Sequence, residues 1–228
     1  MAIDPVMDWK EFVIELQQKI LPIYLAHEKK FDPQGVHGRI HICRALVFGE
    51  VMARFYQATG VPIDFYAVRV AIAFHDSGRE GNGKDRWEQQ SADKCFSHLT
   101  KQPKFSNNPS EAHRIADRIL KIGAWDLLQH NVHDADVLEI MRPDCGHGGL
   151  EKFRRDALRF SVDGAQLSGE KVSSDKLRED LIQEAWRFIE GTEAQKVQFF
   201  NSPVYMDKLM AWLSERKSQF NILSRVCL

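Results

Sequence analysis

The chain has 228 residues, of which 43% are hydrophobic, and a formal net charge of −1. This length fits one domain over residues 1–228, with room for a small lobe at about 88–125, and the apolar content is enough for a buried core. A nearly neutral chain lacks the basic field that attracts nucleic acid, so no nucleic-acid partner is expected. No apolar run approaches the roughly 20 residues of a membrane span, and no secretory signal is visible, so we expect a soluble protein.

The four cysteines are widely separated in the sequence and form no CxxC pair: Cys43, Cys95, Cys145 and Cys227. This spacing argues against a disulfide framework and against a zinc site made of cysteines alone. It is typical of a protein from a reducing compartment.

Apolar residues recur at helical spacing in the first third of the chain. They predict a helix over about 9–27, which Pro22 would kink or divide, and a second helix over about 37–58. The residues between them, 31–36, resemble a loop. Asp64 is a helix N-cap and predicts a third helix that runs to the His75-Asp76 pair.

The middle of the chain continues the helical pattern. A Gly-rich loop follows His75-Asp76, and residues 87–99 form the next predicted helix, with a polar connection over 101–107. Asn108-Pro109-Ser110-Glu111 is a strong helix start, and that helix is expected to end near Gly123.

The last third is expected to contain several shorter helices. Two pieces are predicted at 125–130 and 133–141, and 143–149 is a loop. Further helices are predicted at these positions, with a polar connector over 161–175: 150–161, 176–190, 193–200 and 204–220. Because no stretch alternates with period two, the predicted fold class is all-α.

The polar residues that interrupt these helices suggest a single site. An apolar run ends at His75-Asp76, and the loop after it contains Glu80 and Lys84. His37 and His41 are four residues apart and therefore project from one face at the start of their helix. We interpret these groups, together with those over 133–147, as parts of one pocket.

One hypothesis for this set is a metal centre. Nitrogen and oxygen ligands would come from His41, His75, Asp76 and either Asp136 or Asp134. Their order resembles the H…HD…D pattern of HD-domain phosphohydrolases, which implies an HD-domain-like helical bundle with a small additional lobe. Relatives can lose the ion and keep the scaffold. We therefore predict His75, Asp76 and Asp136 as a structural network or the relic of a metal site, with no metal and no other cofactor bound.

A second resemblance rests on three longer motifs. These are Val36-His37-Gly38-Arg39-Ile40-His41-Ile42-Cys43-Arg44, His75-Asp76-Ser77-Gly78-Arg79-Glu80-Gly81-Asn82-Gly83 and Gly146-His147-Gly148-Gly149. They resemble the phosphodiesterase domain of SidE-type bacterial effectors and of the stand-alone phosphoribosyl-ubiquitin-specific deubiquitinases. The resemblance covers roughly residues 8–220. It implies a bacterial protein that is secreted into the host cytosol.

Phosphodiester cleavage needs a nucleophile and a proton donor. An imidazole can attack phosphorus to form a phosphohistidine, and a second, protonated imidazole can protonate the leaving oxygen. The resemblance implies that His37 is the nucleophile, that Glu80 is its orienting carboxylate and that His147 is the general acid and then the base. Cations near these motifs are predicted to bind the substrate phosphate, together with His41. They are Arg44, Lys84 and Arg154.

The resemblance also implies the partners, which are ADP-ribosylated or phosphoribosyl-linked ubiquitin and proteins modified on serine. The family either transfers phosphoribosyl-ubiquitin to serine with release of AMP or removes it. No ADP-ribosyltransferase domain fits in 228 residues, so removal is expected. Two alternatives stay open: a metal-dependent HD-type phosphohydrolase of nucleotides or cyclic dinucleotides, and a non-catalytic ubiquitin-binding helical module.

Overall fold

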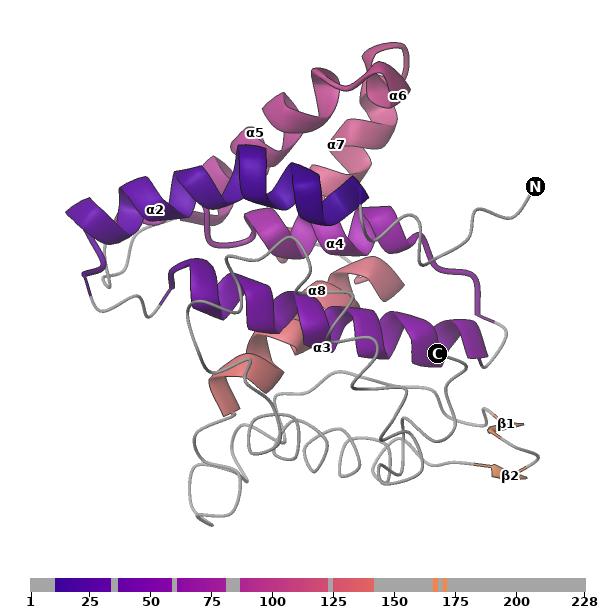
Figure 1. Ribbon diagram of the computed structural model, residues 1–228. Coiled ribbons are helices and arrows are strands. Elements are labelled where there is room, and N and C mark those ends of the chain that lie inside the picture. The colour runs from indigo at the N-terminus through magenta and orange to yellow at the C-terminus, as the bar shows by residue number, and fades with distance from the viewer. Residues whose placement is uncertain are drawn as a thin grey trace.

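The computed structural model describes residues 11–33, 37–58, 61–80, 87–122 and 125–141, together with the backbone of residues 166–167 and 170–171. Helices dominate this part of the chain (Figure 1), and the predicted all-α class is confirmed. Two short strands, β1 (Gln166–Leu167) and β2 (Glu170–Lys171), pair antiparallel within the predicted connector. The helices predicted over 150–161, 176–190, 193–200 and 204–220 lie outside the described residues.

The N-terminal helix is continuous across the proline that was expected to break it. Residues 11–15 are helical, η1 (Leu16–Ile20) is a π-helical segment, and α2 (Leu21–Lys30) follows directly. Pro22 is the second residue of α2, and because the helix continues from η1, its missing N–H leaves one carbonyl of the preceding turn without the usual intrahelical donor. The helix is irregular directly before the proline, where the π-helical segment replaces the regular α-helical hydrogen bonds.

Three helices form the centre of the structure: α3 (Arg39–Ala58), α4 (Phe65–Phe74) and α8 (Leu127–Met141). Each contacts the other two, and α4 is covered on a further side by the N-terminal helix (Figure 1). Every residue of α4 from Ala67 onward is buried. The predicted N-cap is confirmed, because Asp64 Oδ1 accepts a hydrogen bond from the amide of Ala67 at 3.0 Å.

An ion pair joins α3 to α4 inside this core. Arg69 is the largest fully buried side chain among the described residues. Its Nε and Nη2 donate to the two carboxylate oxygens of Glu50 at 3.1 and 3.2 Å. A charge without access to water is tolerated only with such a partner, so the pair fixes how the two helices face each other.

Helices α5 (Trp87–Thr100), α6 (Pro103–Ser106) and α7 (Pro109–Asp117) pack on one another beside α4 (Figure 1). The connection predicted as purely polar contains α6, because Phe105 is buried against the core. Helix α7 ends at Asp117, earlier than expected. The small lobe at about 88–125 falls on these helices and stays a prediction.

The two short pieces predicted at 125–130 and 133–141 are one helix, so that prediction was wrong. Asp126 precedes α8, and its Oδ1 accepts from the amide of Gln129 at 2.9 Å. Asn131 and Val132, at the expected break, are buried in the middle of α8. Tertiary burial overrides their weak helix propensity.

In the described part of the chain, no helix is long and apolar enough to cross a membrane.

Replacing Arg69 by methionine tests the buried ion pair. The change keeps an apolar stem but leaves the Glu50 carboxylate buried without its cation, so we expect the free energy of unfolding to fall by about 3–5 kcal/mol. Urea denaturation followed by circular dichroism measures this. The double variant Glu50→Gln/Arg69→Met is the matched control and should lose less than Arg69→Met alone; an equal or larger loss would contradict the charge argument.

Candidate active site

The site is built at the C-terminal end of α4. The chain turns tightly after Phe74, with the amide of Ser77 donating to Phe74 O at 2.9 Å and that of Arg79 to Asp76 O at 3.1 Å. The last carbonyls of the helix have partners as well, because Tyr24 Oη donates to Ala73 O at 2.9 Å. His75 and Asp76 are therefore buried in a rigid turn and not in a loose loop.

Gly78 lets this turn lie against the start of α5. Its amide donates to Ser91 Oγ at 2.8 Å. A Cβ at this position would lie 2.5 Å from Trp87 O and 2.6 Å from the backbone nitrogen of Ser91. Backbone atoms cannot move aside, so a residue without a side chain is needed here. The close approach places Arg79 next to Trp87.

The second wall is the start of α3. Asp32 Oδ2 accepts from the amide of His37 at 2.7 Å, and Glu28 Oε1 accepts from the amide of Arg39 at 2.7 Å. Glu28 Oε2 also accepts from Arg39 Nε at 2.9 Å. Carboxylates are favourable partners for the free amides at a helix start. They hold His37 in a fixed position ahead of the first turn.

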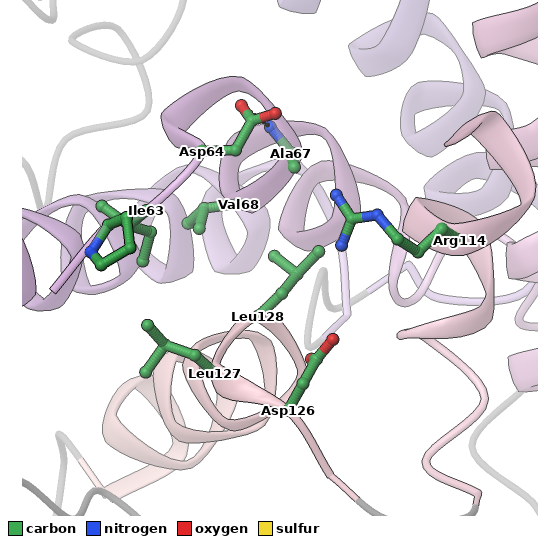
Figure 2. A pocket seen from close by; sticks show the side chains of 9 residues that line it. Ile63, Asp64, Ala67, Val68, Arg114, Asp126, Leu127 and Leu128 are labelled. Carbon is green, nitrogen blue, oxygen red and sulfur yellow. Dashed lines mark hydrogen bonds between the residues drawn. The ribbon is translucent and has the colours of Figure 1, made fainter. Parts of the chain in front are cut away.

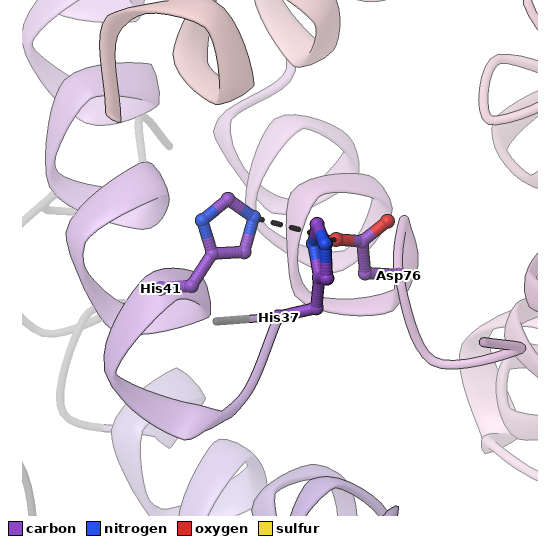
Figure 3. A group of neighbouring side chains, drawn as sticks. All are labelled: His37, His41 and Asp76. Carbon is purple, nitrogen blue, oxygen red and sulfur yellow. Dashed lines mark hydrogen bonds and ion pairs between the residues drawn. The ribbon is translucent and has the colours of Figure 1, made fainter. Parts of the chain in front are cut away.

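His37 and Asp76 meet across these two walls. The distance from His37 Nδ1 to Asp76 Oδ2 is 3.0 Å, and Figure 3 shows the imidazole ring directly against the carboxylate. The His37 side chain is 20% exposed and that of Asp76 only 3%. The imidazole therefore reaches the surface while its partner is enclosed.

A second imidazole lies deeper. His41 Nε2 lies 3.2 Å from His75 Nε2, 3.5 Å from Asp76 Oδ2 and 3.4 Å from Asp136 Oδ1. His75 Nδ1 donates to Ile72 O at 2.7 Å, so its Nε2 can accept a hydrogen bond from His41 Nε2. Of the two aspartates considered in the sequence, Asp136 is the one that approaches His41 and His75, and Asp134 Oδ1 accepts a hydrogen bond from His133 Nδ1.

Glu139 completes the buried group and was missed by the sequence interpretation. Its Oε2 lies 2.9 Å from His41 Nδ1, and its Oε1 accepts from Arg44 Nη1 at 3.4 Å. Glu139 lies three residues after Asp136 on α8, so both project from the same helix face. That spacing was the signal available in the sequence.

The charges of these groups support one another. Burial would lower the pKa of His41, but hydrogen bonds to Asp76 and Glu139 and the charge of Asp136 raise it to about 10. Burial would raise the pKa of Asp76, yet interactions with His75, His37 and His41 hold it well below its usual value. Asp136 behaves in the same way, with a pKa of about 2. These pKa shifts favour a protonated His41 between the ionised carboxylates of Asp76 and Asp136.

Two overlapping sets of side chains have donor atoms close enough to hold a metal ion. One is His37, His41 and Asp76; the other is His41, His75 and Asp136. Within each set the donor atoms lie within 4.8 Å of one another. Nitrogen and oxygen donors of this kind suit a divalent transition metal.

The remaining predicted site residues are placed as follows. Glu80 is exposed at the end of the turn, and its role as the orienting partner of His37 stays a prediction, while His37 Nδ1 contacts Asp76. His41 is buried and Arg44 half-buried in the group around Glu139, and their contact with substrate stays a prediction. Lys84, His147 and Arg154 lie outside the described residues.

A separate cavity of about 240 Å³ lies at the other end of α4 (Figure 2). Its lining includes Asp64, Val68, Arg114 and Leu128. None of the predicted site residues lines it. Since α4 has ten residues, its two ends are about 15 Å apart.

Comparison with known families agrees with the geometry. The family model described as "SidE phosphodiesterase (PDE) domain" matches residues 23–198, well over half of the chain. The protein is thus a phosphodiesterase in class. It belongs to the SidE phosphodiesterase domain family. Searches of curated proteins and of solved structures gave no match.

The buried charges predict a pH dependence of stability. The pKa of His41 is raised, so its contribution is complete below the ordinary histidine value of about 6.5 and is lost as pH rises toward about 10. Urea denaturation from pH 6 to 10, in buffer with a chelator, should show a falling free energy of unfolding. His41→Gln should be less stable at pH 6 and should lose most of this slope. An unchanged slope would contradict a protonated His41.

Proposed function

We propose that the protein cleaves the phosphodiester of ADP-ribosylated or serine-linked phosphoribosyl-ubiquitin through a phosphohistidine on His37. Membership of the SidE phosphodiesterase family supports the reaction class. The observation that carries the residue assignment is the 3.0 Å contact between His37 Nδ1 and Asp76 Oδ2. This contact engages the inner nitrogen of the ring and leaves Nε2 as the nitrogen that can attack.

The covalent step follows from this arrangement. His37 Nε2 forms a bond to phosphorus while the bond from phosphorus to the leaving oxygen breaks, and that oxygen takes a proton from a general acid. His147 is proposed as this acid and, in the second step, as the base that activates water or a serine hydroxyl. Positive charge develops on His37 during attack, and the adjacent buried carboxylate of Asp76 favours it.

The two reaction directions share this intermediate. Attack by water on the phosphohistidine removes ubiquitin from serine, and attack by serine attaches it. Removal is the direction we propose, and Lys84 and Arg154 are proposed to bind the substrate phosphate. Removal is tested on serine-linked phosphoribosyl-ubiquitin, which should yield free phosphoribosyl-ubiquitin. Attachment is tested on ADP-ribosylated ubiquitin with a serine-containing acceptor protein, which should yield the serine-linked product.

His37→Ala should lower cleavage by at least about 1000-fold, the scale expected when a covalent nucleophile is removed. Release of AMP from ADP-ribosylated ubiquitin, measured by chromatography, reports the first step. His147→Ala should let the intermediate accumulate, and intact mass after an alkaline quench should show added phosphoribosyl-ubiquitin that is absent from the double variant His37→Ala/His147→Ala.

His113→Ala is the matched control, since His113 is an exposed imidazole that stacks on Phe96 away from the site. It should keep the activity of the unmodified protein. Added mass on His147 in a His37→Ala background would reverse the two roles, and full activity of His37→Ala would reject the mechanism.

A metal-dependent phosphohydrolase is the second candidate, favoured by the spacing of the donor atoms of His41, His75 and Asp136. We expect activity of the purified protein on ubiquitin substrates to survive chelation, because the proposed nucleophile is a side chain and not a metal-bound hydroxide. Elemental analysis and assay after dialysis against a chelator test this. A stoichiometric transition metal, with activity lost on its removal and regained on its return, would establish the second candidate instead.

A further inference from the structure

We propose that Asp76 is the positioning residue of the nucleophile: it holds His37 in the tautomer that carries the proton on Nδ1, and Arg79 fixes the carboxylate in the orientation that does so. This inference rests on the proposed function, in which His37 Nε2 attacks phosphorus. It also assigns to Asp76 the orienting role that was predicted for Glu80 from the sequence.

The first step concerns the tautomer of His37. An ionised carboxylate can only accept hydrogen bonds, so the 3.0 Å contact with Asp76 Oδ2 requires the proton on His37 Nδ1. A neutral imidazole has one N–H, and its other nitrogen, Nε2, therefore keeps its lone pair. The amide of His37 is fixed at the same time by Asp32. The ring is thus held both in place and in the nucleophilic tautomer.

The second step concerns what orients the carboxylate. Arg79 Nε donates to Asp76 Oδ1 at 2.8 Å, and the Arg79 guanidinium lies 3.5 Å from the centre of the Trp87 ring. Its side chain is only 12% exposed. A guanidinium has donors and no acceptor, so the Oδ1 end of residue 76 must be an acceptor. The stacking on Trp87 prevents the guanidinium from turning away.

Asp136 offers the matched comparison. Asp76 Oδ2 also lies 3.5 Å from His41 Nε2 and 3.6 Å from His75 Nε2. If Asp76 only stabilised the fold, it would do so through these two contacts. Asp136 approaches the same two imidazoles at 3.4 and 3.5 Å. Among the described contacts, only Asp76 adds His37 to this pair. A property of His37 that depends on Asp76 and not on Asp136 therefore reports positioning.

Asparagine at position 76 should reverse the tautomer. Its amide oxygen must face Arg79, because the guanidinium cannot accept, and its NH₂ group then faces His37 Nδ1. His37 can accept this hydrogen bond only by moving its proton to Nε2, which removes the nucleophilic lone pair. In a Ser-His-Asp triad the corresponding change keeps the geometry and lowers kcat by about 10⁴.

The tautomer is measured on ¹⁵N-labelled protein by long-range correlation of the histidine ring nitrogens, with His37→Ala used to assign the His37 signals. We expect the Nδ1–H form in the unmodified protein and in Asp136→Asn, and the Nε2–H form in Asp76→Asn. In Asp76→Asn, kcat for AMP release should fall by about 10²–10⁴ with KM changed less than about threefold. An Nε2–H tautomer in the unmodified protein, which needs no variant, would overturn the inference.

Removal of Arg79 provides a rescue. In Asp76→Asn/Arg79→Ala the amide is free to turn its oxygen toward His37, so the Nδ1–H form and at least about tenfold of the lost kcat should return. A double variant that is slower than Asp76→Asn, with the tautomer still reversed, would refute the role of Arg79. Failure of the proposed function would give a different result: the tautomers would be as expected, but no phosphohistidine would form on His37.

Discussion

Charge neutrality at the buried end of α4 is the constraint on which the rest of the site depends. His75 and Asp76 leave an apolar helix at a point with almost no access to water. Three carboxylates and several cationic groups then have to balance within one small volume, because an unpaired buried charge costs several kcal/mol. Helix α8 supplies Asp136 and Glu139, α3 supplies His41, and the turn itself supplies Arg79. Three helices are thereby locked together by one electrostatic requirement.

The same constraint separates two imidazoles that look alike in the sequence. His37 and His41 are four residues apart in the sequence, but only His41 is enclosed by carboxylates on both ring nitrogens. His37 has its carboxylate on Nδ1 and reaches the surface. Burial therefore makes one imidazole a fixed cation of the scaffold and leaves the other available for chemistry. Position along the chain could not distinguish these roles.

Much of the fold could be predicted from local signals. Asp64 as a cap and the mostly apolar α4 were evident because capping and burial leave strong local patterns. The continuity of α8 was not, since Asn131 and Val132 are poor helix formers that only burial stabilises. Phe105 marks the same limit, because the helix around it exists to cover the core and has little propensity of its own.

The candidate site was predictable to a similar degree. His41, His75, Asp76 and Asp136 were found from their order alone, and the structure brings them together. Glu139 was missed because its role depends on how α8 is rotated against α3. The contact between Asp76 and His37 Nδ1 was not predicted, because motif order says nothing about the turn after Phe74, which directs Asp76 inward.

The packing of the N-terminal helix against the core has a practical consequence for where this domain begins. The family match starts at residue 23, but Phe12, Val13, Leu16 and Ile20 are buried against the same core as Tyr24. Each contributes about 1.5–3 kcal/mol by its burial, and their sum is comparable with the whole stability of a typical domain. A fragment trimmed at the edge of sequence similarity would thus expose the apolar underside of α4. The physical boundary of the folding unit lies upstream of the boundary drawn by homology.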